Sequence, residues 1–345
     1  MRIFVLYPGH ASSTIDVADG WVNALKALGH DVQDWHHHEV LTFYETAFAA
    51  WHDKNRGFNP GVGEVIWMAS RAAIAQMVVT PPDIIIVVTG LAVHRDFYVA
   101  VKKLGIPMAL ILTESPYADQ LQQDMCRAIR PDVVFVNERN SVNLYSGMGL
   151  RAMYLPHSYD PKRHYPRKVP PGFQSDVCFI GTLYPERKAL FDTVDWTGIN
   201  RKFICQELGD SSPDRIENAE AANYYCGAKI CLNLHRTVMG VNANEMVHID
   251  IGDAWSTNPR TFEIAACGGF QIADNARGEL EVALSGTVPT FRTARELETL
   301  VRYFLSADEE RQRIARLQAE QVRGCSFEER GRTIVIPELE RLWQK

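Results

Sequence analysis

The chain has 345 residues, 46% of them hydrophobic, which allows two domains of ordinary size and excludes a largely disordered protein. Its formal net charge of −6 argues against a protein that coats nucleic acid through bulk charge. None of the seven cysteines forms a Cys-x-x-Cys pair, and we expect buried, reduced thiols and a cytoplasmic location. We expect neither a signal peptide nor a membrane span, because the first apolar run is short and no run approaches about 20 apolar residues.

The N-terminal half alternates predicted strands and helices. Apolar runs predict buried strands at residues 2–7, 30–35, 84–89, 108–112 and 133–136. A helical pattern over 21–28 ends at Gly29, so the first three elements form a βαβ unit. In sheets built this way, ligands bind outside the carboxyl ends of the strands.

Polar residues follow several of these strands. His10 and Ser12 follow the first strand, and His94, Glu114 and Asn137 follow three later ones. A histidine has a pKa near the working pH, so His10 and His94 are candidates for a catalytic base. Ser12, Glu114 and Asn137 are candidates for contacts with an acceptor. The structural alternative is that these residues cap or support the helices that follow.

The segment His36-His37-His38-Glu39 raises the question of a metal site. On an extended chain, consecutive side chains point to opposite faces, so at most His36 and His38 could converge. No third ligand is evident. The sequence therefore predicts no metal site.

The segment from Asn258 to Asp274 predicts one short helix followed by a strand. Asn258 is a favourable N-cap, Pro259 suits the first helical position, and Gly268 with Gly269 ends the helix. Arg260 and Glu263 are three residues apart and share a helix face. A cation beside the amides of a helix N-terminus suits a phosphate, whereas the alternative is an ordinary surface ion pair.

Three further features precede this helix in the chain. A proline-rich span from Tyr154 to Gly172 marks a domain boundary. Gly181 follows a predicted strand at 176–180 and would allow close approach of a phosphate, with charge from Arg187 or Lys188. A plain helix-capping turn is the alternative there. Residues 239–253 predict a loop and contain no Asp-x-Asp triplet.

The segment Phe262-Glu-Ile-Ala-Ala-Cys-Gly-Gly269 resembles the nucleotide-sugar motif of glycosyltransferases with two Rossmann-like domains, the GT-B fold. More narrowly, it resembles the CgeB-like, spore-maturation branch of the group 1 glycosyltransferases. Cys231-Leu-Asn-Leu-His-Arg236 is similar to a strand end of that branch, and Leu155-Pro-His-Ser-Tyr-Asp-Pro161 to its connector. One departure is Trp255, which stands where the wider group often has a second glutamate.

The resemblance implies an α/β protein whose two Rossmann-like domains face each other across a cleft. We expect an acceptor domain at 1–165, a donor domain at 172–325, and a C-terminal helix at 326–345 that packs on the first domain. Glu263 would hold the donor ribose, and His157 would lie at the cleft edge as a third candidate base. The donor-binding set would be Gly181, Arg187, Lys188, His235, Arg236, Asn258, Arg260 and Glu263.

The expected activity is transfer of a hexose or pentose from a nucleotide sugar to a hydroxyl acceptor, without metal or other cofactor. The acceptor would be a glycan, a small molecule or a modified DNA base. The alternatives are a sugar-nucleotide epimerase of the same fold and a non-catalytic nucleotide-binding module. A redox Rossmann enzyme is disfavoured, because no Gly-x-Gly-x-x-Gly follows the first strand.

Overall fold

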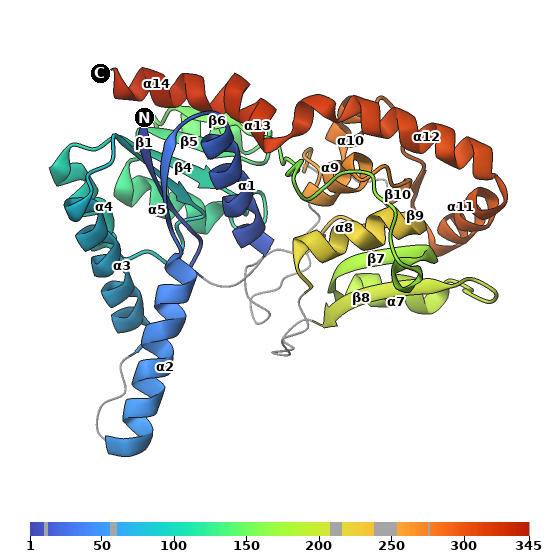
Figure 1. Cartoon of the computed structure of the whole chain (residues 1–345), viewed down its shortest axis with the longest axis horizontal. Coiled ribbons are helices and arrows are strands. Elements are labelled where there is room, and N and C mark those ends of the chain that lie inside the picture. Colours follow the sequence, from blue (N-terminus) through green and yellow to red (C-terminus); the bar gives the residue numbers. More distant parts are fainter. Residues whose placement is uncertain (10–12, 56–60, 208–215, 238–253, 275–276, 345) are drawn as a thin grey trace. The chain divides into compact units, whose positions relative to one another are not determined.

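The computed structural model describes residues 1–9, 13–55, 61–207, 216–237, 254–274 and 277–344, and Figure 1 shows their course. They form two compact units. The first unit comprises residues 1–155 and 328–345, and the second comprises residues 156–327. His10, Ser12 and the predicted loop at 239–253 lie outside the described residues.

The first unit is built on a six-stranded parallel sheet with the spatial order β2-β1-β3-β4-β5-β6. Every residue of the central strand β3 is buried. The strands are β1 (Arg2–Leu6), β2 (Asp31–Trp35), β3 (Ile84–Val88), β4 (Met108–Leu112), β5 (Val133–Val136) and β6 (Ala152–Tyr154). All five strands that the apolar runs predicted are therefore present, and the strand order reverses between β1 and β3.

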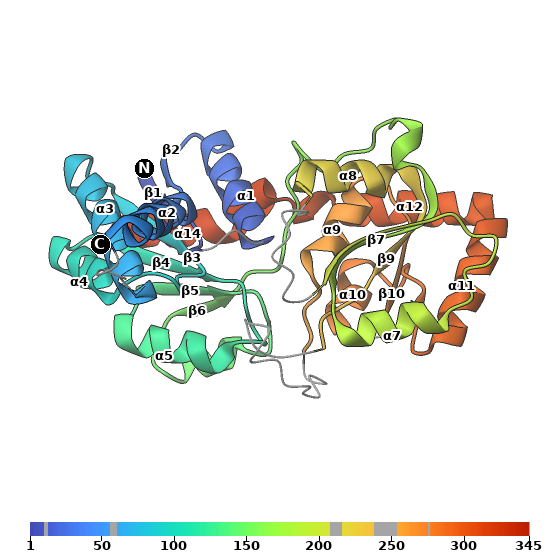
Figure 2. The same cartoon turned by 90° about the horizontal axis from the view of Figure 1, so that it is seen from below.

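Helices cover both faces of this sheet, with α1 and α5 on opposite sides (Figure 2). One face packs Phe4, Leu6 and Val87 of the strands against Phe97 of α4 and Cys126 of α5. The helices before the unit boundary are α1 (Ser13–Ala27), α2 (His37–Asn55), α3 (Val62–Val79), α4 (Arg95–Leu104), α5 (Asp119–Ile129) and α6 (Val142–Ser146).

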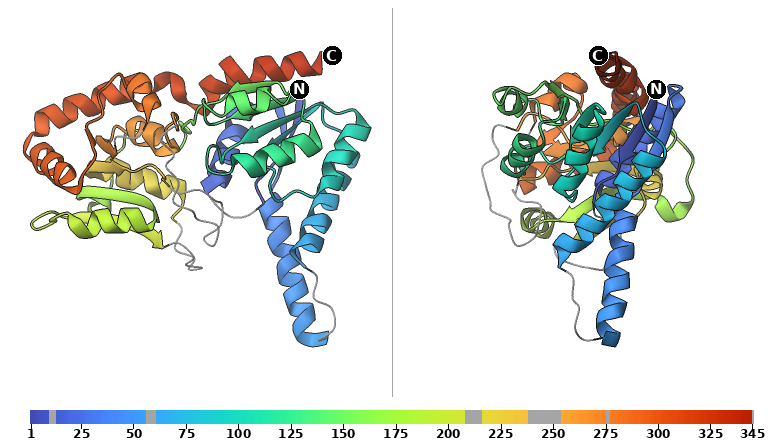
Figure 3. Two further views of the ribbon diagram at one scale, coloured as in Figure 1. Left: turned by 180° about the vertical axis from the view of Figure 1, so that it is seen from behind. Right: turned by 90° about the vertical axis from the view of Figure 1, so that its left-hand side faces the viewer.

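The aromatic-rich stretch after β2 forms α2, which runs beside α3 (Figure 3). Among the described residues, α3 is the one helix with the length and apolar composition of a membrane span. Five of its residues, including Ala69, Ala73 and Met77, are buried in the first unit. One face of α3 therefore packs within this unit, whereas Val62, Val78 and Val79 are exposed.

The second unit has a five-stranded parallel sheet with the order β11-β10-β9-β7-β8. The first strand of the unit, β7, thus has β8 on one side and β9 on the other, and the order reverses between β7 and β9. The strands are β7 (Ser175–Leu183), β8 (Arg201–Glu207), β9 (Ala228–Asn233), β10 (Gln271–Asp274) and β11 (Thr290–Phe291).

Alternate residues of β7 serve the two faces of this sheet, as the pleat requires. Phe179 packs with Phe191 of α7, whereas Cys178 packs with Ala222 of α8 and Ile264 of α9. Figure 2 shows α7 and α8 on opposite sides of the strands. The helices are η1 (Pro171–Phe173), α7 (Pro185–Thr193), α8 (Asn218–Gly227), α9 (Pro259–Ala266), α10 (Gly278–Ala283), α11 (Ala294–Ser306), α12 (Asp308–Gln321) and η3 (Arg323–Cys325).

The last helical segment returns to the first unit. It runs through α13 (Phe327–Arg330), the π-helical turn η4 (Gly331–Val335) and α14 (Ile336–Trp343). Leu339 of α14 is fully buried, and the Glu338 carboxylate accepts hydrogen bonds from Arg151 at 2.5 Å and from Arg341 at 2.9 Å. An apolar contact and an ion-pair network therefore hold α14 within this unit.

Candidate functional site

The candidate site lies in the second unit, at the carboxyl ends of β7 and β9. The strand order reverses between these two strands, and a parallel α/β sheet opens a ligand crevice at such a point. Gly181 lies near the end of β7, and Leu234 and His235 follow β9 directly. The topology alone therefore brings residues about 50 positions apart in the chain to one place.

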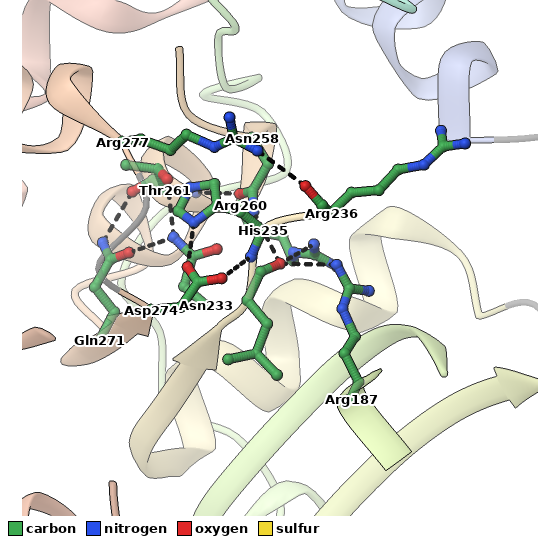
Figure 4. Close-up of polar contacts among 11 residues, drawn as sticks. Arg187, Asn233, His235, Arg236, Asn258, Arg260, Thr261, Gln271, Asp274 and Arg277 are labelled. Atoms are coloured by element: carbon green, nitrogen blue, oxygen red, sulfur yellow. Dashed lines mark hydrogen bonds and ion pairs between the residues drawn. The ribbon is translucent and has the colours of Figure 1, made fainter. Parts of the chain in front are cut away.

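The helix α9 starts beside these strand ends and begins as the sequence predicted. The Asn258 side chain accepts a hydrogen bond from the Thr261 amide at 3.3 Å, and Pro259 occupies the first helical position. The Asn258 side chain also donates to the Leu234 carbonyl at 3.3 Å (Figure 4). One asparagine thus caps the helix and fixes it to the end of β9.

Arg260 points from the first turn of α9 to the end of β7. Its Nη1 donates to the Ile180 carbonyl at 2.7 Å, and its Nη2 donates to the Leu234 carbonyl at 3.0 Å. Gly181 makes room for this side chain: a Cβ at Gly181 would lie 2.3 Å from Arg260 Nη1, and the backbone has φ +152°. A side chain at this position would therefore displace the Arg260 guanidinium.

Arg187, in the first turn of α7, reaches the same carbonyl. Its Nη2 donates to Leu234 at 2.9 Å, and its Nη1 donates to Thr182 at 2.8 Å. The residue is only 4% exposed, and burial, with a smaller contribution from Arg260, lowers the pKa of Arg187 to about 10. Arg187 nevertheless carries its positive charge at neutral pH.

Among the described residues, the guanidinium groups of Arg187 and Arg260 have no carboxylate in direct contact, although Asp274 and Glu186 lie near enough to favour the charged form of Arg187. Within the described parts of the chain, neither forms an ion pair with a carboxylate, and the Nε atom of each has no hydrogen-bond partner. Two adjacent cations, one of them buried, repel each other unless an anion lies between them. The arrangement is suited to an anionic ligand such as a phosphate, which a guanidinium binds through paired hydrogen bonds.

His235 follows Leu234 in the chain, and its side chain is paired with Asp274 at the end of β10. The His235 amide donates to Asp274 Oδ2 at 2.9 Å, and the His235 Nδ1 contacts Asp274 Oδ1 (Figure 4). Burial lowers the pKa of His235, although the neighbouring Asp274 acts to raise it. The neutral ring then carries its proton on Nδ1, and Nε2 has no partner among the described residues.

We expect this histidine to make stability depend on pH. The folded pKa lies below 6.5, so below about pH 6.5 the unfolded chain takes up a proton that the folded chain does not bind. The free energy of unfolding therefore falls as the pH falls from 6.5 toward the folded pKa. His235→Asn should show a smaller fall between pH 7.5 and 5.5 in denaturant titrations; equal slopes would contradict the assignment.

Arg236 and Arg277 lie at the edge of the site. The Arg277 side chain donates to the Arg236 carbonyl at 2.9 Å, and the Arg236 side chain extends away from the arginine pair (Figure 4). The Arg236 guanidinium lies 5.6 Å from the centre of the Tyr184 ring, and that of Arg187 lies 4.8 Å from it. Arg277 is a basic residue of the site that the sequence did not single out.

Glu263 and Arg260 contact different parts of the second unit. Glu263 is 8% exposed, and its Oε1 accepts a hydrogen bond from Asn218 of α8 at 3.2 Å. It forms no ion pair with Arg260, so the alternative of an ordinary surface ion pair is wrong for the described residues. Both side chains project from one turn of α9, but they contact different neighbours.

A short hydrogen-bond chain holds Glu263 in place. The Asp160 amide donates to Nδ1 of His164, so the neutral His164 ring has its proton on Nε2 and donates it to Asn218 Oδ1. Asn218 then donates to Glu263. His164 and Asn218 are positioning residues that the sequence did not reveal, because they lie 99 and 45 positions away from the glutamate.

Lys188 is placed differently from the expectation. Its amine lies 3.5 Å from the Asp192 carboxylate on the exposed face of α7, with 57% of its side chain accessible. One residue after Arg187 on a helix, Lys188 is turned by about 100° to another face. Of the two basic residues predicted in this loop, the structure brings only Arg187 to Arg260.

The candidates in the first unit already have structural partners. His94 is the N-cap of α4, and its Nδ1 accepts a hydrogen bond from the Asp96 amide at 3.2 Å. The Asn137 side chain donates to the Ser115 carbonyl at 2.7 Å and accepts from the Ser115 amide at 3.1 Å. The Glu114 amide donates to Gln122. The structural alternative to cleft contacts is thus observed for His94 and Asn137.

Known proteins resemble the chain in both sequence and fold. Residues 184–335 match a family model described as glycosyl transferase-like. The chain is 25% identical over 250 residues to the spore protein CgeB of Bacillus subtilis (strain 168), covering 68% of this chain and 75% of CgeB. Sucrose-phosphate synthase from Thermosynechococcus elongatus has a TM-score of 0.60 at 13% identity, with 99% and 98% of the two chains covered. HepE of Anabaena, in complex with UDP and glucose, has a TM-score of 0.57 at 14% identity, with both chains fully covered.

The two parallel sheets and their helices are therefore those of the GT-B glycosyltransferase fold, as the sequence predicted. Residues 184–335 are thus similar to the glycosyl transferase-like family, and most of the chain is similar to CgeB.

Proposed function

We propose that the chain transfers a hexose or pentose from a nucleotide-sugar donor to a hydroxyl acceptor. The observation that supports this most directly is the pair Arg187 and Arg260, two cations at a topological switch point without a carboxylate partner in the described residues. A nucleoside diphosphate carries the charge that this pair lacks. HepE, which shares the fold, is described in complex with UDP and glucose.

In the proposed reaction, the bond between the anomeric carbon and the diphosphate oxygen breaks, and its electron pair stays on that oxygen. The guanidinium groups of Arg187 and Arg260 stabilise the charge that develops there. Such stabilisation in a site shielded from water is worth roughly 3–4 kcal/mol of barrier for one donor group. Fixed cations would supply it without a metal ion at the diphosphate.

Glu263 would accept hydrogen bonds from the two ribose hydroxyls of the donor. Its Oε1 is oriented by Asn218, whereas its Oε2 makes no hydrogen bond within the described parts of the chain. The unprotonated Nε2 of His235 would accept a hydrogen bond from another hydroxyl of the nucleotide sugar. Asn258 would act indirectly, because it holds α9 against the end of β9.

A base must remove the proton of the acceptor hydroxyl as the new sugar–oxygen bond forms. The Nδ1 atom of His94 already accepts a hydrogen bond from the Asp96 amide. The neutral ring therefore carries its proton on Nε2 and is poorly suited to take the proton of the acceptor. The base is therefore His10 or His157. The acceptor remains a glycan, a small molecule or a modified DNA base.

We expect one nucleotide sugar, from a panel that begins with UDP-glucose, to raise the melting temperature of the full chain. A ligand at 100 times its Kd adds about 2.7 kcal/mol to the free energy of unfolding. The double variant Arg187→Lys/Arg260→Lys keeps the charge but lacks the paired donors, and should lose most of this shift. An unchanged shift in that variant would contradict the donor site.

Product analysis then separates the function classes. A transferase consumes the donor only when a suitable acceptor is present, apart from slow hydrolysis. An epimerase converts the donor alone, and a binding module leaves it intact. Donor conversion without any acceptor would replace the proposed activity by epimerisation.

A further inference from the structure

A cluster of metal-ligand side chains lies in the first unit, where the chain leaves β2 and enters α2. His36 follows the last residue of β2, and His38 and Glu39 lie in the first turn of α2. One ligand atom from each of the three residues lies within 4.8 Å of the other two. A third ligand was not evident from the sequence, which was interpreted as an extended chain here; the structure places Glu39 beside the two histidines because the chain becomes helical at His37.

The distances within the cluster suit a small divalent ion. Glu39 Oε1 lies 3.8 Å from His36 Nδ1 and 3.9 Å from His38 Nε2. A tetrahedral ion with bonds of about 2.0–2.1 Å needs its ligand atoms about 3.4 Å apart. Shifts of about 0.5 Å would bring Glu39 Oε1 to this distance from both histidines, and the Glu39 side chain is 69% exposed and so can move.

A carboxylate lies near the second ring nitrogen of His36. This nitrogen, Nε2, lies 3.7 Å from the Asp34 carboxylate. A ligating histidine commonly directs its second N–H toward a carboxylate, which fixes the tautomer and leaves the other nitrogen free to bind the ion. The ring of Tyr7, which is almost fully buried, lies 4.4 Å from the His36 ring and limits its motion.

We propose that His36, His38 and Glu39 bind a divalent transition metal, with Zn²⁺ as the best fit. Two imidazole nitrogens and one carboxylate oxygen form a mixed N/O ligand set, which favours Zn²⁺ over Mg²⁺ or Ca²⁺. Three protein ligands leave a fourth position open, as in catalytic rather than structural zinc sites. That position takes water or an oxygen of a bound small molecule. The residues of this cluster belong to the first unit, whereas the arginine pair belongs to the second.

The test is a titration of the full chain with Co²⁺, and then with Zn²⁺ in competition. The visible spectrum of Co²⁺ reports the geometry, and a thiolate charge-transfer band would reveal binding to any of the seven cysteines instead. We expect one ion per chain without a thiolate band. His36→Ala/His38→Ala should weaken binding at least about 100-fold, and Asp34→Asn about 10-fold.

Glu39→Gln is the sharpest single variant, because its exposed position should leave folding intact. It should weaken binding at least about 10-fold, whereas Glu45→Gln, an exposed glutamate on the same helix, should leave it unchanged. Far-ultraviolet circular dichroism confirms that each variant is folded. Equal Co²⁺ affinity in the wild type and the double histidine variant, or a spectrum dominated by thiolate, would overturn the proposal and leave these contacts as histidine–glutamate ion pairs.

Discussion

Replacing Glu263 by Gln is expected to lower the affinity for a nucleoside diphosphate at least about 100-fold while leaving the fold intact. A hydrogen bond to a charged group contributes about 1.5–3 kcal/mol, and two ribose hydroxyls would lose this charge assistance together. Each 1.4 kcal/mol corresponds to about a tenfold change in Kd. The glutamine oxygen can still accept the Asn218 hydrogen bond, so the local network of α8 and α9 persists.

The measurement is calorimetry with UDP, or the base that the panel selects, and with its 2′,3′-dideoxy analogue. If Glu263 holds the ribose hydroxyls, the wild type should lose affinity for the analogue, whereas Glu263→Gln should bind both ligands alike. Glu296→Gln makes the same chemical change in the capping box of α11, also in the second unit, and should not alter affinity. A variant that still discriminates between the two ligands would show that the ribose contact is elsewhere.

A substitution of Asn218, which donates a hydrogen bond to Glu263, tests the same ribose contact. Asn218→Ala removes the donor to Oε1 but keeps the carboxylate itself. We therefore expect a smaller loss of affinity for the nucleotide than in Glu263→Gln, and no loss for the dideoxy analogue, which lacks the two hydroxyls. A structural role without contact to the ligand would lower the melting temperature but not change the ratio of the two affinities.

The sequence predicted this site where short-range rules govern it. Asn258, Pro259 and the glycine pair after Cys267 define α9 through local capping, and the structure has that helix and the strand β10 after it. The buried strands were predicted for a similar reason, since a parallel sheet covered on both faces needs continuous apolar runs. Local spacing also placed Arg260 and Glu263 on one helix.

What the sequence could not show are the partners that only the fold brings together. Arg187 and Arg260 meet through the carbonyl of Leu234, and no spacing rule connects these three residues. His164 and Asn218 reach Glu263 from two separate segments. Lys188 was included because it is adjacent to Arg187 in sequence, but adjacent residues on a helix point to different sides.

The second large effect is expected at Gly181. In Gly181→Ala, the new Cβ would lie 2.3 Å from Arg260 Nη1, closer than the roughly 3.0 Å that real contacts allow, at a φ that glycine tolerates best. The guanidinium would have to leave the Ile180 carbonyl and move out of the arginine pair. We expect donor affinity to fall about 10- to 100-fold, the value of one charged hydrogen-bond donor to phosphate.

A double-mutant cycle separates this indirect effect from simple destabilisation. Because Gly181→Ala would act through Arg260, its effect on donor affinity should largely vanish in an Arg260→Ala background, with a coupling energy of about 1–3 kcal/mol. Gly172→Ala, where an added Cβ meets nothing within 4 Å, is the matched control and should leave affinity unchanged. Additive losses of affinity would mean that Gly181 contacts the donor directly, with its backbone against the diphosphate, and that Arg260 contributes independently of it.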